Sequence, residues 1–150
     1  YLGNEEWVGL NIATSRVLVA GCGTSRLSGD LHTAGYPNVC SSDFDAGCVA
    51  HLEAEFGHRE GMTFVVADMS KPQAEPHEEL ADASYEMIVD KGTMDALLCV
   101  DKGCAGMLCE AHRLLVDGGV YVVVSFHSPK LITALLTPSA LSFEVTAVEQ

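Results

Sequence analysis

Five short apolar runs constrain the fold of this chain more than any other feature of its sequence. They lie at residues 17–20, 39–42, 62–67, 85–89 and 120–125. A short, continuous apolar run is typical of a strand that is buried on both faces of a parallel sheet. Because helical segments separate most of these runs, the sequence predicts an α/β protein with a doubly wound, mostly parallel sheet, helices on both faces and right-handed crossovers.

The segments between and after the strands predict four helices. The first follows Thr24 or Ser25, either of which can cap it, and extends to about residue 34. The other three are expected at residues 46–56 after the N-cap Asp45, at 93–115 with a break near Gly103 and Gly106 and an end at Gly118 and Gly119, and at 129–136. Residues 71–83 predict a surface loop or short helix, and residues 143–148 alternate like an edge strand.

The first apolar run breaks into a glycine-rich turn at Gly21, Cys22 and Gly23. Gly21 can take a positive φ for a tight turn, and Gly23 has no Cβ that would keep a ligand from the backbone. A strand that ends in this way before a helix favours a nucleoside-containing cofactor lying on the turn. A plain β–α turn, in which glycine serves geometry alone, is the alternative.

Aspartates stand where three of the predicted strands end, at Asp43, Asp68 and Asp90. In a doubly wound sheet, ligands lie across the carboxyl ends of the strands. Asp43 follows the glycines by about 20 residues, where an acidic side chain can accept both hydroxyls of a ribose; a helix-capping role is its alternative. Asp68 can accept from an exocyclic amino group while Met69 packs on a purine face, although aspartates are also common in turns.

The charge of the chain bears on its partners. With 8 basic and 21 acidic residues, the formal net charge is −13. Such a field repels phosphate backbones, so we expect no nucleic-acid partner. It attracts cations, including a lysine-bearing protein segment, although charge can also serve solubility alone.

Six cysteines stand mostly in apolar runs and form no CxxC pair. We therefore expect reduced, buried thiols and a cytoplasmic protein, with a mitochondrial one as the alternative. Cys104, Cys109 and His112 match no common zinc spacing, so we expect buried helix residues and no metal. No apolar run approaches the roughly 20 residues that cross a bilayer, and no signal peptide is visible, so we expect no membrane partner.

Several motifs in order resemble the seven-β-strand (class I) S-adenosylmethionine-dependent methyltransferases. They are the glycine turn through Thr24 and Ser25, then Ser42-Asp43-Phe44, Ala67-Asp68-Met69, and the block Asp90-Lys91-Gly92-Thr93-Met94-Asp95-Ala96-Leu97. That last block, D-K-G-T-x-D-A-L, is the most specific and is similar to the group that includes lysine methyltransferases of elongation factor 1A and of citrate synthase. Ser125-Phe126-His127-Ser128-Pro129 continues the match, which covers roughly residues 16–136.

The resemblance implies a Rossmann-like fold, S-adenosylmethionine as cofactor and a set of site residues. The methionine and ribose portion of the cofactor would be lined by the turn residues Gly21, Cys22, Gly23, Thr24 and Ser25. Asp43 would hold the ribose hydroxyls and Phe44 would lie against the adenine, whose edge Asp68 and Met69 would meet. Asp90 and Lys91 would lie beside the methionine end. Asp90 is the expected catalytic residue, orienting the acceptor amine. A surface turn with a salt bridge is the alternative for Asp90 and Lys91, and Thr93 and Asp95 are expected to cap the next helix.

Methyl transfer to an amine is an in-line displacement, so we expect catalysis by alignment and by exclusion of water around the cationic sulfur. The resemblance favours a protein with a target lysine over a small molecule as acceptor. A lysine must react as the neutral amine, because the ammonium has no lone pair.

Parts of the family's pattern are missing. The full fold ends with two more strands, but after residue 141 there is room for one at most, and the aromatic N-terminal segment is reduced to the region of Trp7. The single domain expected over residues 1–150 is therefore either a fragment or has lost part of its substrate site. An unpaired sheet edge would favour homodimerisation or instability.

Two further functions stay open. The first is a catalytically weak S-adenosylmethionine-binding or scaffold module. The second is a nicotinamide-dependent dehydrogenase, which would require a glycine in place of Arg26 and leaves the Asp90 block unexplained.

Overall fold

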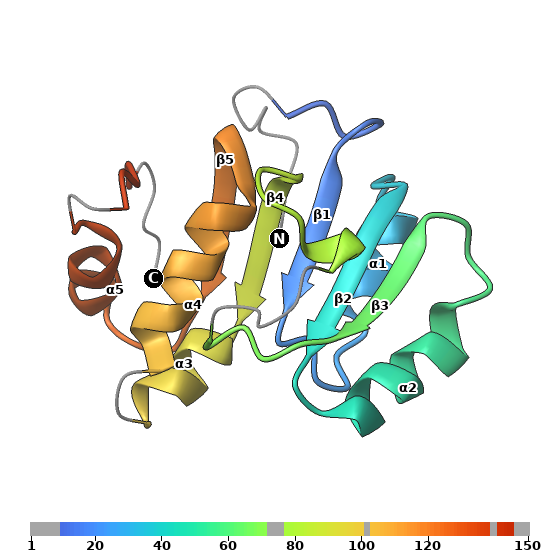
Figure 1. Cartoon of the computed structure of the whole chain (residues 1–150), viewed down its shortest axis with the longest axis horizontal. Coiled ribbons are helices and arrows are strands. Elements are labelled where there is room, and N and C mark those ends of the chain that lie inside the picture. Colours follow the sequence, from blue (N-terminus) through green and yellow to red (C-terminus); the bar gives the residue numbers. More distant parts are fainter. Residues whose placement is uncertain (1–9, 72–76, 101–102, 139–140, 146–150) are drawn as a thin grey trace.

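A computed structural model describes residues 10–71, 77–100, 103–138 and 141–145 of the chain. Within these ranges the protein is one parallel sheet with helices on both faces (Figure 1). The strands are β1 (Arg16–Ala20), β2 (Asn38–Asp43), β3 (Met62–Val66), β4 (Tyr85–Lys91) and β5 (Leu115–Val124), in the order β3-β2-β1-β4-β5. All four pairings are parallel, which confirms the predicted fold class.

The helices are α1 (Leu27–Thr33), α2 (Ala46–Phe56), α3 (Thr93–Leu98), α4 (Gly103–Leu114) and α5 (Pro129–Leu136), with a 3-10 turn, η1 (Glu78–Leu80). Alternate residues of β1 face opposite layers of the core. Val17 and Val19 pack in the cluster that holds Leu31 of α1 and Leu52 of α2. Leu18 and Ala20 pack in the cluster on the other face, which holds Leu80 of η1 together with Met107, Ala111 and Leu114 of α4. The side chains of residues 17–20 are therefore all buried, as their continuous apolar run predicts.

Two helix starts follow local capping chemistry, and one does not. Asp45 accepts from the backbone N–H groups of Gly47 and Cys48 at the start of α2, as predicted. Ser128 accepts from Leu131 N at the start of α5. Helix α1, however, begins at Leu27, and Arg26 at its N-cap position makes no side-chain capping bond. Of the two predicted caps, Ser25 does accept from Leu27 N over a long 3.4 Å through its hydroxyl, although it stands one residue before the N-cap position.

The two glycine pairs of the third predicted helix act differently from expectation. The helical stretch divides into α3 and α4, but Gly106 lies inside α4. A Cβ on Gly106 would lie 1.8 Å from Ser70 O, so this glycine permits close packing of α4 on a loop. The helix ends at Leu114, before Gly118 and Gly119, which lie in β5 where its register against β4 shifts.

The end of the described chain contains no strand. Phe143 lies outside any strand, with its ring centroid 5.9 Å from that of Tyr121 on β5. Of the predicted edge strand, residues 143–145 are irregular, and residues 146–148 lie outside the described residues. Among the strands that the structure describes, β5 pairs only with β4, so the edge expected to support a homodimer remains a prediction.

Candidate functional site

The strands β1 to β4 point their carboxyl ends toward the same edge of the sheet, where α3 begins (Figure 1). We call this the carboxyl edge. The glycine turn after β1 lies here, with φ of +66° at Gly21 and +51° at Gly23. Cys22 N donates to Ser42 O over 2.9 Å, and Gly23 N donates to Asp43 Oδ2 over 2.8 Å. The turn is thus attached to the end of β2.

Asp43 is buried, with 7% of its surface exposed, and both of its oxygens accept from backbone. Beyond the bond from Gly23 N, Asp43 Oδ1 accepts from Asp45 N over 2.9 Å. Burial, with the Asp43 charge adding to it, raises the pKa of the neighbouring Cys22 thiol to about 12. Cys22 is therefore a neutral thiol at physiological pH, and its contribution to the turn is its backbone.

Gly23 leaves space beside the chain. A Cβ added to Gly23 would meet no protein atom within 4 Å, whereas one on Gly21 would meet the Thr93 side chain at 2.1 Å. Phe44, which follows Asp43, exposes 76% of its surface. A bare backbone turn, a buried carboxylate and an exposed aromatic ring at neighbouring strand ends fit a nucleoside ligand, since each supplies a contact that such a ligand uses.

Asp68 and Met69 lie after β3, and their side chains have separate surroundings. Asp68 accepts from Ser70 N and from Lys71 Nζ at 2.6 Å, and hydrogen bonds from Lys71 and Ser70 hold the pKa of its carboxyl below the usual range. The Met69 side chain is buried in the core cluster with Leu80 and Met107. The contact of these two residues with an adenine stays a prediction.

Asp90, at the end of β4, is fully buried. Its Oδ1 accepts from Thr93 N at 2.8 Å, and its Oδ2 accepts from Met94 N at 3.0 Å and from the Tyr121 hydroxyl at 3.1 Å. Burial raises the pKa of Asp90, against these hydrogen bonds, which lower it. Asp90 therefore closes the N-terminus of α3, and its expected contact with an acceptor amine stays a prediction. Lys91 beside it is exposed.

Asp95, in the first turn of α3, makes contacts that its sequence position does not reveal. Predicted as a helix cap, it instead accepts from the Ser125 hydroxyl and, through Oδ2, from Phe126 N at 3.2 Å. The Asp95 side chain thus holds the loop that follows β5. His127 Nε2 lies 3.9 Å from Asp95 Oδ1, and this buried nitrogen has no hydrogen-bond partner in the described structure.

Phe126 exposes 80% of its surface at the same loop, and its ring centroid lies 4.8 Å from that of His127. Sequence reasoning gave neither residue a role. The signal was present, because both lie in the Ser125–Pro129 motif directly after a predicted strand. Thr24 and Ser25 lie at the turn, the former exposed and the latter half-buried.

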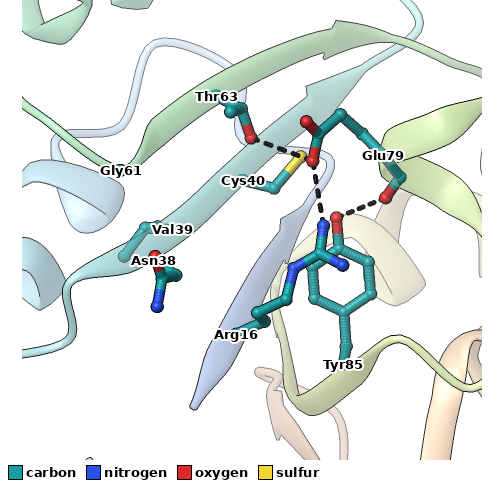
Figure 2. A pocket seen from close by; sticks show the side chains of 8 residues that line it. All are labelled: Arg16, Asn38, Val39, Cys40, Gly61, Thr63, Glu79 and Tyr85. Carbon is teal, nitrogen blue, oxygen red and sulfur yellow. Dashed lines mark hydrogen bonds and ion pairs between the residues drawn. The ribbon is translucent and has the colours of Figure 1, made fainter. Parts of the chain in front are cut away.

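A hollow of about 180 Å³ lies at the opposite, amino edge of the sheet. Figure 2 shows the polar side chains of Arg16, Thr63, Glu79 and Tyr85 turned toward one another. Arg16 Nη2 pairs with Glu79 Oε2 at 3.0 Å, and the Tyr85 hydroxyl donates to Glu79 O at 2.5 Å. None of the predicted site residues lines this hollow, so it is separate from the glycine turn.

The structure tests the expected burial of the cysteines and of His112. Cys22, Cys40 and Cys104 are buried as expected, whereas Cys99 and Cys109 are exposed, and all six are free thiols. His112 is also exposed, because its side of α4 faces outward, so the expectation of burial was wrong for it and for Cys109. Within the described residues, no three potential ligands are grouped to hold a metal ion. No helix of the described part is long and apolar enough to span a bilayer.

Comparisons with known proteins agree with this arrangement. Residues 18–123 match the family described as a methyltransferase domain. The chain is 34% identical over 120 residues to the eEF1A lysine and N-terminal methyltransferase of Bos taurus, covering 73% of this chain and 16% of that protein. It is 30% identical over 129 residues to EEF1A lysine methyltransferase 4 of Mus musculus, covering 76% and 47%. The chain thus spans less than half the length of either relative.

A solved structure shares the fold. The TehB-like SAM-dependent methyltransferase of Corynebacterium glutamicum superposes with a TM-score of 0.57 at 26% identity, over 73% of this chain and 53% of that one. The matched family residues begin inside β1 and end inside β5, so they include the glycine turn, Asp43, Asp68 and Asp90.

Proposed function

The chain belongs to the class I S-adenosylmethionine-dependent methyltransferases, and from this premise we propose that it binds S-adenosylmethionine at the carboxyl edge and methylates a protein lysine amine. The observation that carries the proposal is the open space beside Gly23, next to the buried Asp43 and the exposed Phe44. We further propose that residues 1–150 act as one cofactor-binding domain.

In this proposal the turn residues Gly21, Cys22, Gly23, Thr24 and Ser25 hold the methionine and ribose portion, and Phe44 packs on the adenine. Asp43 has lone pairs beyond those used by Gly23 N and Asp45 N, so its carboxylate can also accept from ribose hydroxyls. Asp68, Met69 and Lys91 complete the proposed contacts. When bound, the cofactor supplies an electrophilic methyl group on a sulfonium.

The proposed acceptor is a lysine of a basic protein segment. The net charge of −13 favours the approach of such a segment, and two of the similar proteins are named as eEF1A lysine methyltransferases. These names also favour a cytoplasmic setting, which we include in the proposal. Because the Asp90 oxygens already accept from α3, Asp90 is proposed to act through its negative charge, which stabilises the positive charge that the lysine nitrogen gains as it takes the methyl group.

Cofactor binding is tested with Gly23→Ala. Its Cβ meets no protein atom but occupies the proposed ligand space, so we expect calorimetric binding of S-adenosylhomocysteine to be lost. Because φ at Gly23 is +51°, the melting temperature should fall through backbone strain, but no further than in a glycine-to-alanine variant with the same strain elsewhere. Gly118→Ala is the matched control. Gly118 also has a positive φ (+76°) and open surroundings, but it lies near the amino end of β5, away from the carboxyl edge. Binding by Gly23→Ala equal to that of the control would contradict the proposal.

Catalysis is tested with Asp90 and Asp43 variants in a methylation assay with mass-spectrometric detection in a lysate. Asp90→Ala should abolish transfer, and Asp43→Ala should mainly weaken cofactor binding. Asp90→Asn separates the role of Asp90 at the helix start from the role of its charge. The amide oxygen can still accept from Thr93 N, but the negative charge is lost. If both alanine variants retain full activity, the assignment fails.

A non-catalytic cofactor-binding module is the second candidate. The observation that favours it is that the fold itself engages both oxygens of Asp90, the expected catalytic group. Binding of S-adenosylhomocysteine without methylation of any protein or small molecule in the lysate would support this candidate over the enzyme.

A further inference from the structure

The Thr93 side chain connects two strand ends that are distant in sequence. Its hydroxyl lies at the start of α3 and donates toward Ala20 O at 2.9 Å and Gly21 O at 3.2 Å. These carbonyls belong to the end of β1 and the first residue of the glycine turn. The hydroxyl therefore bonds to the proposed cofactor turn, 72 to 73 residues earlier in the chain.

Thr93 also fills the space beside the Gly21 α-carbon. A Cβ on Gly21 would lie 2.1 Å from Thr93 Oγ1, 2.6 Å from its Cγ2 and 2.9 Å from its Cβ. The absence of a side chain at position 21 is thus required by this contact as well as by the positive φ of +66°. The backbone of the turn and the Thr93 side chain form one packed unit.

The glycine turn is held from two sides. On the β2 side, Cys22 N and Gly23 N donate to Ser42 O and to the Asp43 carboxylate. On the β4 side, Thr93 is the only described residue whose side chain donates a hydrogen bond to this part of the chain. The carbonyl orientation at the first residue of the turn therefore depends on the Thr93 hydroxyl.

Helix α3 itself does not use the Thr93 hydroxyl. Gly92 occupies its N-cap position with φ of +84° and no side-chain capping bond, and Asp90 takes the N–H groups of Thr93 and Met94. The predicted role of Thr93 as a helix cap is therefore wrong. Its hydroxyl is available for the turn because the neighbouring aspartate closes the helix.

We propose that Thr93 is a positioning residue for the methyl donor, which fixes the glycine turn in its ligand-binding shape through the Gly21 contact. This inference rests on the proposed function, since it concerns the same site. It assigns the threonine of the D-K-G-T block to the cofactor side of the reaction, and it predicts that loss of the hydroxyl weakens cofactor binding selectively.

The test compares Thr93→Val, which keeps the shape and removes the donor, with Thr93→Ser, which keeps the donor. Titration with S-adenosylhomocysteine, well below the melting temperature, should show about tenfold weaker binding by Thr93→Val, as expected for loss of one partly buried hydrogen bond. Thr93→Ser should recover most of the affinity. Thr137→Val is the matched control, because the Thr137 hydroxyl bonds only within its own helix end, to Thr133 O.

The outcomes separate this inference from the proposed function. If the wild-type protein does not bind S-adenosylhomocysteine, the proposed function fails. If the wild-type protein and Thr93→Val bind equally, the function stands and the positioning role is overturned. A purely structural role would lower the melting temperature of Thr93→Val and of Thr93→Ser without this difference in affinity between them.

Hydrogen–deuterium exchange of the wild-type protein gives a second measurement if Thr93→Val does not fold. Addition of S-adenosylhomocysteine should increase protection of the amides of residues 21–25 and of Thr93 and Met94 together, because one packed unit is stabilised. Protection confined to residues 21–25 would overturn the proposal.

Discussion

The two edges of the sheet both carry polar side chains, but they use them differently. At the amino edge, Arg16 pairs with Glu79, and the Tyr85 hydroxyl bonds to the Glu79 backbone (Figure 2). At the carboxyl edge, Asp43 and Asp90 accept from the backbone N–H groups of loops and of a helix start. The polar groups at the amino edge thus bond to one another across a hollow. The carboxylates at the carboxyl edge instead accept hydrogen bonds from backbone and hold the glycine turn and the start of α3 in place.

This difference shows why a hollow alone does not identify a ligand site. The amino-edge hollow already contains an ion pair and a hydrogen bond between its own lining residues, so a ligand would compete with them. At the carboxyl edge, the space beside Gly23 is open, and the Asp43 carboxylate fixes the turn by accepting a hydrogen bond from Gly23 N. Substitutions at four positions test whether the edges are as separate as this comparison implies.

Gly21→Ala should have the largest effect. Its Cβ would lie 2.1 Å from Thr93 Oγ1, and the residue would keep a positive φ. Overpacking and backbone strain together predict a loss of about 2–5 kcal/mol in the free energy of unfolding, along with loss of S-adenosylhomocysteine binding. Chemical denaturation measures the first effect and calorimetry the second, with Gly118→Ala as the control for strain without a clash. A Gly21→Ala variant that is as stable as the wild-type protein and binds the ligand normally would contradict the tight packing of Gly21 against Thr93.

Asp90→Ala should rank second. It leaves the buried N–H groups of Thr93 and Met94 without their acceptor, which predicts a loss of about 1–3 kcal/mol in the free energy of unfolding. Asp90→Asn should be milder, because its amide oxygen can accept from Thr93 N and its amide can donate to the Tyr121 hydroxyl. Equal losses in the two variants would contradict the capping role.

The same pair predicts a pH dependence. Burial raises the pKa of Asp90 in the folded chain. The stability gained from its protonation is therefore complete below the unfolded pKa of about 3.9 and is lost as the pH rises through the higher folded value. As the pH rises from below the unfolded pKa to above the folded pKa of Asp90, the free energy of unfolding of the wild-type protein should fall relative to that of Asp90→Asn. Urea titrations at several pH values measure this difference.

Tyr85→Phe tests the amino edge with a smaller effect. It removes the hydroxyl that donates to Glu79 O and should cost about 1 kcal/mol in the free energy of unfolding. The affinity for S-adenosylhomocysteine should not change, since Tyr85 lies at the opposite end of β4 from Asp90. Weaker ligand binding by this variant would break the distinction between the two edges.

Lys71→Ala should have the smallest effect. Its ammonium, on an exposed side chain, pairs with Asp68 at 2.6 Å, and such surface pairs contribute less than about 1 kcal/mol to stability. The pKa of Asp68 should rise toward its ordinary value, because Lys71 is the first cause of its lowering. Nuclear magnetic resonance titration measures that rise, and an unchanged pKa would contradict the pairing.

Much of the fold was predictable because its signals are local. The bounds of α2 and α5 agree with the prediction, since Asp45 caps the first and Ser128 with Pro129 begins the second. The break between α3 and α4 was anticipated, but Gly106 was misread, because only its contact with Ser70 across the fold explains a glycine inside a helix.

The alternation of strands and helices, the glycine turn and the aspartates at the strand ends can be read from the sequence, because burial and capping act between near neighbours in the chain. The strand order and the partners of Thr93 and Asp95 become visible only in the folded protein, since each of these two residues bonds to a residue at least 30 positions away. A hydroxyl or carboxylate satisfies whichever group the packed sheet brings within reach. The spacing of residues along the chain does not specify that group.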